Sequence, residues 1–175
     1  MKPRYVPLVL AALLLLGVLA AWARPPEAAA ATPTRPANTI DFTGVRDIQL
    51  GETDAQLTSE GALARPQAAC GPVLTEISQA SPVFADGQLV ILWANPPLTT
   101  PEGVGVGTPL ATAQAAYPDA TTLSAPPGTY QFDGLMVTNG DRSYLFLHDS
   151  QTVRKAVVGY TDHVQRLFTT GFGSC

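Results

Sequence analysis

The chain has 175 residues, a length that suits one compact domain or two small ones. Charged residues make up only 14% of it, and 16 prolines and 15 glycines favour turns over long helices. The formal net charge is −4, and it falls to −6 without residues 1–31, which carry three basic residues and one acidic residue. The sequence offers no basic stripe to neutralise phosphates, so we expect neither nucleic acid nor an anionic lipid surface as a partner.

The first 23 residues have the layout of an export signal. A short basic start precedes an uncharged apolar run over residues 5–23, which ends in Ala-Trp-Ala, a small-residue cleavage pattern. The run also approaches the length of a membrane-spanning helix, so a cleaved signal peptide and an uncleaved anchor both stay open. In either case we expect the rest of the chain to be extracellular or in the cell envelope, and membrane contact only through residues 5–23 if they are not cleaved.

Residues 24–39 follow as a linker rich in Ala, Pro and Thr, without apolar periodicity. Both cysteines, Cys70 and Cys175, lie beyond this linker, and an even count in an oxidising compartment indicates one disulfide. A metal site would need more ligands than two cysteines and two distant histidines provide, and a nucleophilic cysteine would need a basic neighbour. We therefore predict a Cys70–Cys175 disulfide, and neither a metal nor another cofactor.

The first predicted module covers residues 40–100. Thr53 is placed to cap a short helix through its hydroxyl, and Pro66 would end that helix. The clearest feature follows at residues 82–94, where two apolar stretches flank Asp86-Gly87. This pair suits a two-residue type I′ turn, so the pattern predicts a β-hairpin.

The second predicted module covers residues 101–175. It opens with Gly-Val-Gly-Val-Gly at residues 103–107, and the apolar spacing that follows predicts a short helix over residues 110–117. The glycine run lacks the Gly-Lys-Ser/Thr of a phosphate-binding loop, so nucleotide binding is not expected. Asn139-Gly140 predicts another hairpin turn. The strands expected here are Tyr130–Val137, Tyr144–Leu147, Val153–Tyr160 and Val164–Phe168.

The two modules have similar layouts. Gly51 and Gly107 each follow an apolar stretch and precede a short helix, and the Asp86-Gly87 and Asp149-Ser150 turns are each followed by Gln and an apolar strand. The alternative is two unrelated glycine turns and two ordinary hairpins. The predicted fold class is α+β, with two tandem modules that each contain a short helix and a three- to four-stranded antiparallel sheet.

These features resemble the bacterial exported modules related to the β-lactamase inhibitory protein. The resemblance rests on Leu50–Thr53 and Val106–Pro109, each before a short helix, and on the two later hairpins, and it covers roughly residues 40–175. It implies a tandem helix-and-sheet fold whose concave sheet face grips a partner protein, with inhibitor-like binding as one form of that function. The apolar spacing of the first helix departs from the family pattern.

Candidate catalytic groups are few. His148 follows a predicted strand and precedes Asp149, and His163 follows Asp162; these are the two histidines of the chain. A small secreted hydrolase that uses His148 or His163 with an acid is one alternative function. The hairpin position of His148 predicts an exposed turn residue instead, and no Gly-x-Ser-x-Gly motif is present. We therefore expect no enzymatic activity.

The candidate partner-binding residues are aromatic side chains on predicted strands. They are Trp93, Tyr130, Phe132, Tyr144 and Tyr160. Such residues usually fill a core, but on an open sheet face they would anchor an interface. Strand alternation predicts that Trp93 shares a face with Ile91, and Leu92 with Val90. The predicted function is an exported binding protein for a protein or envelope component, and a structural envelope protein is the other alternative.

Overall fold

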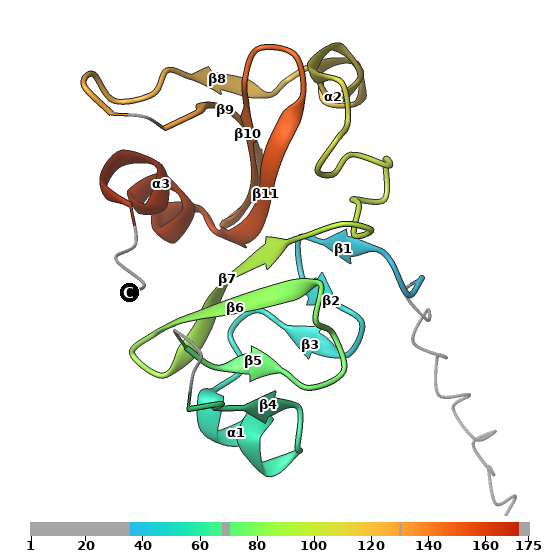
Figure 1. The fold of residues 1–175 in the computed structure, drawn as a ribbon, viewed down its shortest axis with the longest axis vertical. Coiled ribbons are helices and arrows are strands. Elements are labelled where there is room, and N and C mark those ends of the chain that lie inside the picture. The colour runs from blue at the N-terminus through green and yellow to red at the C-terminus, as the bar shows by residue number, and fades with distance from the viewer. Residues whose placement is uncertain (1–35, 68–70, 130, 172–175) are drawn as a thin grey trace, which may run out of the picture. The chain divides into compact units, whose positions relative to one another are not determined.

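The computed structural model describes residues 36–67, 71–129 and 131–171, which belong to one compact unit. The elements of this unit form an α+β fold with mainly antiparallel strands and three helices among the described residues (Figure 1). In chain order they are β1 (Ile40–Asp41), β2 (Gly44–Val45), β3 (Ile48–Gln49), α1 (Asp54–Ser59), β4 (Leu63–Ala64), β5 (Val73–Leu74), β6 (Ala80–Ala85), β7 (Gln88–Ala94), α2 (Leu110–Ala116), β8 (Thr121–Leu123), β9 (Asp133–Asn139), β10 (Arg142–His148), β11 (Val153–Tyr160) and α3 (Thr161–Thr170).

One six-stranded antiparallel sheet organises the fold. Its strand order is β6-β7-β11-β10-β9-β8, so a hairpin from residues 40–100 and four strands from residues 101–175 share a single sheet. The strands β1-β2-β3 and β4-β5 form two smaller sheets, which are not part of the six-stranded sheet. The sequence predicted a separate antiparallel sheet in each module. The structure instead has one six-stranded sheet to which both ranges contribute strands.

The predicted Asp86-Gly87 hairpin is present between β6 and β7. Asp86 and Gly87 have φ angles of 50° and 76°, as a turn with two left-handed central residues requires. The hairpin predicted at Asn139-Gly140 is present too, but β9 extends through Asn139. The turn residues are therefore Gly140 and Asp141, one position later than predicted.

The short helices begin near where the sequence predicts them. Thr53 caps α1, because its Oγ1 accepts a hydrogen bond of 3.1 Å from the Gln56 N–H. The helix ends at Ser59, well before Pro66. Residues 110–116 form α2, in agreement with the predicted apolar face, and Ala113 is fully buried.

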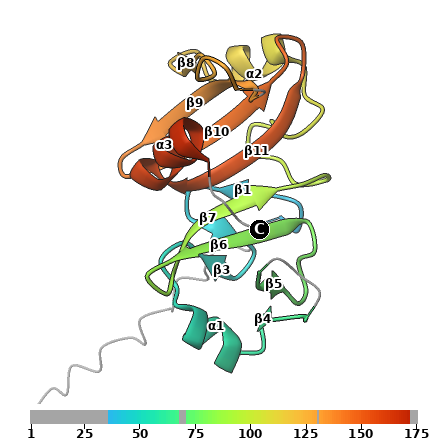
Figure 2. The same ribbon diagram turned by 60° about the vertical axis from the view of Figure 1, so that its left-hand side comes forward.

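The strand predicted at Val164–Phe168 is wrong, because these residues lie in α3. Val164, Leu167 and Phe168 are spaced at i, i+3 and i+4 and are all buried, which is the pattern of an amphipathic helix. Figures 1 and 2 show α3 against the strands β9 to β11, and it also contacts β7. The helix thus covers part of one face of the large sheet.

Two separate groups of buried side chains occupy the two faces of the sheet. One group joins the sheet to β1–β3, α1 and α2, and includes Leu57, Leu92 and Tyr144. The other lies beneath α3 and includes Ile91, Leu145 and Phe168. Neither face is open along its full width.

β-Bulges interrupt the alternation in the β6–β7 and β10–β11 hairpins, but not in the β9–β10 hairpin. The pairing of β6 with β7 skips Val90, and the pairing of β10 with β11 skips Arg154. Because of its bulge, Val90 joins Ile91 and Trp93 beneath α3, whereas Leu92 packs on the other face. The prediction that Leu92 shares a face with Val90 is therefore wrong.

The segments that lead into α1 and α2 make matching backbone contacts. The Gly51 N–H donates to the Leu89 carbonyl over 2.8 Å, and the Gly107 N–H donates to the Val153 carbonyl over the same distance. Both glycines have a φ of 95°. Leu89 and Val153 each donate back to the residue after the glycine, over 2.8 and 2.9 Å. The two helices are thus attached to β7 and β11 in the same way.

The strands β7 and β11, which join the β6–β7 hairpin to the other four strands, pair with a symmetric register. Trp93 lies opposite Val157, Leu92 opposite Val158, and Ala94 opposite Ala156. Val157 follows Trp93 by 64 positions, and the same offset relates Leu89 to Val153 and bulged Val90 to bulged Arg154. A rotation of half a turn about the Trp93–Val157 pair therefore exchanges β7 with β11.

Candidate functional site

An open hollow of about 390 Å³ lies where β7 leaves the sheet beside β11. Its lining residues are Ser81, Trp93, Ala94, Asn95, Pro96, Val106, Arg154, Lys155 and Ala156, and we call it the Trp93 hollow. The pairing of β7 with β11 stops at Ala94 and Ala156, and two prolines follow Asn95 in the chain. Because proline lacks an N–H and does not continue a central strand, the chain turns away and leaves Lys155 without a neighbour from β7.

Trp93 and Lys155 form the middle of this hollow. The Lys155 ammonium lies 5.7 Å from the centroid of the Trp93 ring, within the range of a cation–π contact. Trp93 is half-buried and Lys155 is exposed. In the part of the chain that the structure describes, no carboxylate forms a salt bridge with Lys155.

Arg154 is a second cation at the hollow, and Asp149 holds it in place. The Nε and Nη2 atoms of Arg154 lie 2.6 and 2.5 Å from Asp149 Oδ2. Asp149 Oδ1 accepts hydrogen bonds from the N–H groups of Thr152 and Gln151, over 2.8 and 3.0 Å. The Thr152 N–H above all, and then the Arg154 side chain, lower the pKa of Asp149 to about 2. Asp149 thus stays ionised near neutral pH and fixes the position of the guanidinium group.

His148 is not the exposed turn residue that the sequence predicts. It is only 6% exposed, because β10 continues through it and pairs it with Asp133 on one side and Val153 on the other. Its Nδ1 accepts a hydrogen bond of 3.2 Å from the Ser150 N–H. The imidazole therefore supports the β10–β11 turn.

The two histidines do not form a common site. His163 lies in the first turn of α3, which begins beyond the end of β11 that pairs with Arg142. His148 lies at the other end of β10, and six residues of strand span roughly 20 Å. His163 Nε2 is 3.8 Å from Asp162 Oδ2, and its ring lies edge-on to the Tyr160 ring.

The predicted aromatic residues lie in different environments. Tyr144 is 2% exposed, and its ring stacks on Phe42 with the centroids 3.9 Å apart, so it belongs to the core. Trp93, Phe132 and Tyr160 are half-buried at the margin of the cluster beneath α3. Trp93 lines the hollow, whereas Phe132 and Tyr160 do not.

Three of the residues singled out from the sequence cannot be placed. Cys70, Cys175 and Tyr130 lie outside the described residues, so the disulfide stays a prediction. The apolar run of residues 5–23 also lies outside them. Within the described ranges, no helix is both long and apolar enough to cross a bilayer.

Sequence reasoning missed Arg154 and Lys155. One signal was present, because Arg154-Lys155 is the single place in the chain where two basic residues are adjacent, within an otherwise acidic module. Their position beside Trp93 depends on the pairing of β7 with β11, which joins residues 64 positions apart. The local sequence pattern therefore did not predict that Arg154 and Lys155 lie beside Trp93.

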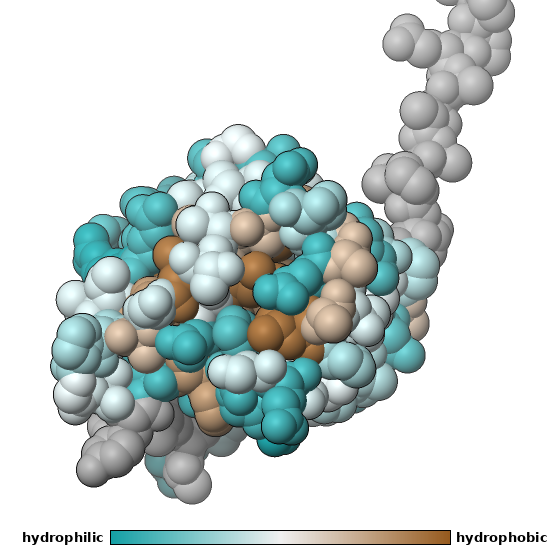
Figure 3. Space-filling model, turned by 90° about the horizontal axis from the view of Figure 1, so that it is seen from above, coloured by the Kyte–Doolittle hydropathy of each residue, from teal (hydrophilic) through white to brown (hydrophobic). Residues whose placement is uncertain are grey.

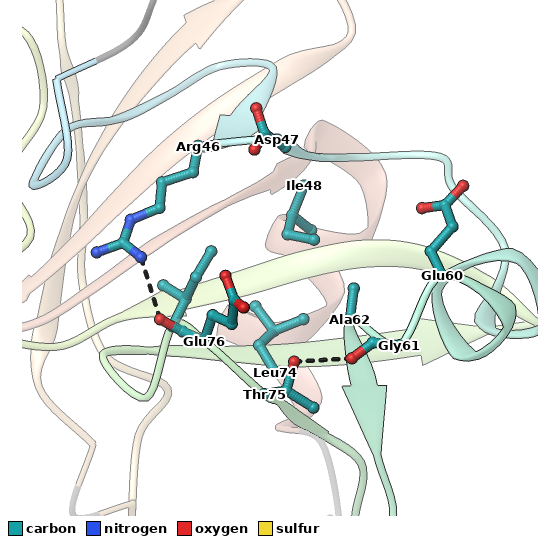
Figure 4. Close-up of a pocket in the computed structure, with 10 residues that line it drawn as sticks. Arg46, Asp47, Ile48, Glu60, Gly61, Ala62, Leu74, Thr75 and Glu76 are labelled. Atoms are coloured by element: carbon teal, nitrogen blue, oxygen red, sulfur yellow. Dashed lines mark hydrogen bonds between the residues drawn. The ribbon is translucent and has the colours of Figure 1, made fainter.

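A second, smaller pocket of about 190 Å³ lies between β3, β5 and the end of α1 (Figure 4). Arg46 donates a hydrogen bond of 3.1 Å to the Glu76 carbonyl, and Thr75 donates one of 2.9 Å to the Gly61 carbonyl. Asp47, Glu60 and Glu76 are also among its lining residues. No group of three His, Cys, Asp or Glu side chains among the described residues is arranged to hold a metal ion. This pocket shows no further sign of a ligand site.

The rest of the surface has few apolar side chains. In the view of Figure 3, hydrophobic residues form small brown spots separated by hydrophilic ones. Among the described residues, Val73 is the one large hydrophobic side chain that is exposed, at 38%. A broad apolar interface is therefore not visible on this face.

We compared the chain with protein-family models, with curated proteins and with solved structures, and found no match. The resemblance to the modules related to the β-lactamase inhibitory protein thus stays a prediction from the sequence.

Proposed function

We propose that the chain is an exported, non-enzymatic binding protein that contacts a partner protein, or another envelope component, through the Trp93 hollow. The observation that carries this proposal is the grouping of Trp93, Arg154 and Lys155 around one concave surface. Tryptophan and arginine are the residue types that most often dominate the binding energy of protein interfaces. Export rests on the signal-like layout of residues 1–23.

The proposed architecture is two related modules, residues 40–100 and 101–175, that complete one sheet together. Two features support it: the matching contacts of Gly51 and Gly107, and the two bulges, whose offset of 64 positions also relates Trp93 to its partner Val157. The β6–β7 and β10–β11 hairpins share an offset of 64 positions, whereas Gly51 and Gly107 are 56 positions apart.

The proposed mode of binding differs from the one that the family resemblance implies. A concave sheet face that grips a partner must be open, but α3 covers part of one face and residues 40–100 cover much of the other. We therefore propose a contact at the margin of the sheet, where β7 ends, and inhibitor-like action would be exerted from there.

A capture experiment tests this proposal. The full-length chain is used as bait against envelope and culture proteins of the source organism, and the captured proteins are identified by mass spectrometry. We expect one dominant partner that is lost with Trp93→Ala and with Lys155→Glu. It should be retained with Arg166→Glu, a matched charge reversal on the exposed side of α3.

Two outcomes would contradict the proposal. A partner retained by both hollow variants binds elsewhere on the chain. The capture of no partner at all would favour a structural envelope protein or a small hydrolase. In that case, an activity screen of the wild type beside a His163→Ala variant would separate these two alternatives.

A further inference from the structure

The two halves of the large sheet have equivalent positions on the face that carries Trp93. The offset of 64 positions that relates the two bulges also relates β6 to β10 and β7 to β11. By this offset Trp93 corresponds to Val157. Ser81, the partner of Trp93 on β6, corresponds to Leu145, the partner of Val157 on β10. Residues that pair directly lie on the same face, so all four side chains are on the face that α3 packs on.

α3 covers this face over one half of the sheet. The helix packs mainly on β10 and β11, where Leu145 and Val157 are 0% and 2% exposed. The chain that follows β7 supplies no matching helix, because Leu98 and Val104 join the buried cluster on the opposite face. The counterparts of the covered residues, on β6 and β7, are exposed or half-buried.

The side chains at equivalent positions also differ in chemistry. The cluster beneath α3 includes the bulged residue Val90 and the next residue, Ile91, which are 4% and 0% exposed. The residues 64 positions later are Arg154 and Lys155, which line the Trp93 hollow. A bulge redirects a side chain, so two successive cations can line one surface. Tryptophan and arginine are typical of protein interfaces, and cations are rare in a core.

A second helix has room on this face. Neighbouring strands are about 4.8 Å apart, so a helix over β6 and β7 would lie roughly 10 Å from α3 over β10 and β11. Packed helices are usually about 8–10 Å apart. A helix on the β6–β7 half would therefore lie beside α3.

We infer that the β6–β7 half of this face docks an amphipathic helix of the partner protein, in the place that corresponds to α3. Apolar side chains of that helix cover Trp93 and Val83, which are half-buried on this face. Carboxylates on its flank meet Arg154 and Lys155, since these two are the charged residues of the hollow's lining. The inference rests on the proposed function and the proposed two-module architecture, and it specifies which element of the partner binds.

Labelled peptides test this inference. The probe is a fluorescein-labelled peptide of three Leu-Glu-Glu-Ala-Leu-Glu-Ala repeats, which has an apolar helical stripe with Glu on its flanks. One control peptide has Pro in place of the fourth residue of each repeat, which breaks the helix, and another has Lys in place of every Glu. Binding to the full-length chain is followed by fluorescence anisotropy. We expect saturable binding of the acidic helix and at least tenfold weaker binding of both controls, although the net charge of −4 would favour the lysine peptide.

Substitutions in the full-length chain locate the binding. Ser81→Glu places a carboxylate beside Trp93 and should weaken the acidic peptide at least tenfold. Thr121→Glu is the matched control, because Thr121 is also exposed, lies in the other edge strand and pairs with Met136 on the same face. It should leave binding unchanged. Lys155→Glu should weaken the acidic peptide and strengthen the lysine peptide.

Other results would overturn the inference. Equal binding of the proline peptide would indicate an extended ligand, and equal losses with Ser81→Glu and Thr121→Glu would place the site elsewhere. Binding that appears only after removal of residues 172–175 would assign this place to the chain's own C-terminal segment. A dimer in analytical ultracentrifugation that Ser81→Glu abolishes would assign it to a second copy.

The capture experiment separates failure of this inference from failure of the proposed function. No peptide binding, with a natural partner still lost on Trp93→Ala, would refute the helix and leave the proposed function intact. A natural partner that Trp93→Ala and Lys155→Glu both retain would refute the proposed function as well.

Discussion

Replacing Gly51 and Gly107 by alanine, one at a time, tests whether Tyr160 fills the space beside Gly51 while the space beside Gly107 is open. Both residues have a φ of 95°, where an L side chain is strained by about 1–2 kcal/mol. Loss of glycine's freedom in the unfolded chain offsets about 0.4–1 kcal/mol of this cost. Gly107→Ala adds no clash, so it should lower the free energy of unfolding by about 1 kcal/mol.

Gly51→Ala should be clearly worse, because its new methyl group would lie 2.6 Å from the Tyr160 hydroxyl oxygen. The ring cannot move away freely, since Arg142 lies 3.4 Å from its centroid on one face. Overpacking of this kind costs about 1–3 kcal/mol, so the total expected for Gly51→Ala is about 2–4 kcal/mol.

Urea unfolding of the full-length chain, followed by circular dichroism, measures both values. The decisive control is Tyr160→Phe, which removes the clashing oxygen and leaves the ring carbon Cζ at 3.9 Å, an ordinary contact. In this background Gly51→Ala should cost no more than Gly107→Ala. The reasoning is refuted if the two glycine variants are equally stable with Tyr160 present, or if Tyr160→Phe brings no relief.

Three further predictions concern other parts of the chain. The pKa of Asp149 is lowered from 3.8 to about 2 in the folded state, so its stabilising contribution is complete above pH 4 and is lost as the pH falls towards 2. The difference in unfolding free energy between the wild type and Asp149→Asn should shrink over this range; a constant difference would contradict it. Tyr144→Ala should cost about 3–5 kcal/mol in urea unfolding, because it empties a fully buried ring position; a cost below about 1 kcal/mol would show that Tyr144 is not in the core. Cys70 and Cys175 should resist alkylation until a reductant is added, and a mass gain without reductant would exclude the predicted disulfide.

Local patterns in the sequence predicted the parts of the fold that depend on neighbouring residues. Asp86-Gly87 formed the expected hairpin because two adjacent residues with positive φ are enough to define that turn. Val164–Phe168 was assigned to the wrong element. Its apolar and β-branched residues fit a strand, but their spacing at i, i+3 and i+4 fits a helix, and packing on the sheet favoured the helix.

Features that depend on strand pairing were not predictable in the same way. His148 is buried because β9 and β11 both pair with the end of β10, and neither register follows from the residues around it. The hollow lies where β7 departs after Ala94, and the bulged residue Arg154 is part of its lining. The sequence shows that Trp93 is aromatic and that Lys155 is charged. It does not show that the two side chains lie next to each other in the fold.

The position of β7 inside the sheet, between β6 and β11, has a consequence for aggregation during folding. Its Leu-Val-Ile-Leu segment pairs at once with β6, but its other edge stays open until β11 arrives, because Val157 lies 64 residues beyond Trp93. An open apolar edge is a template for pairing with other chains. A chain interrupted before Val153 is therefore expected to form aggregates rather than a smaller soluble domain, and β11 acts as the strand that protects β7 from self-association.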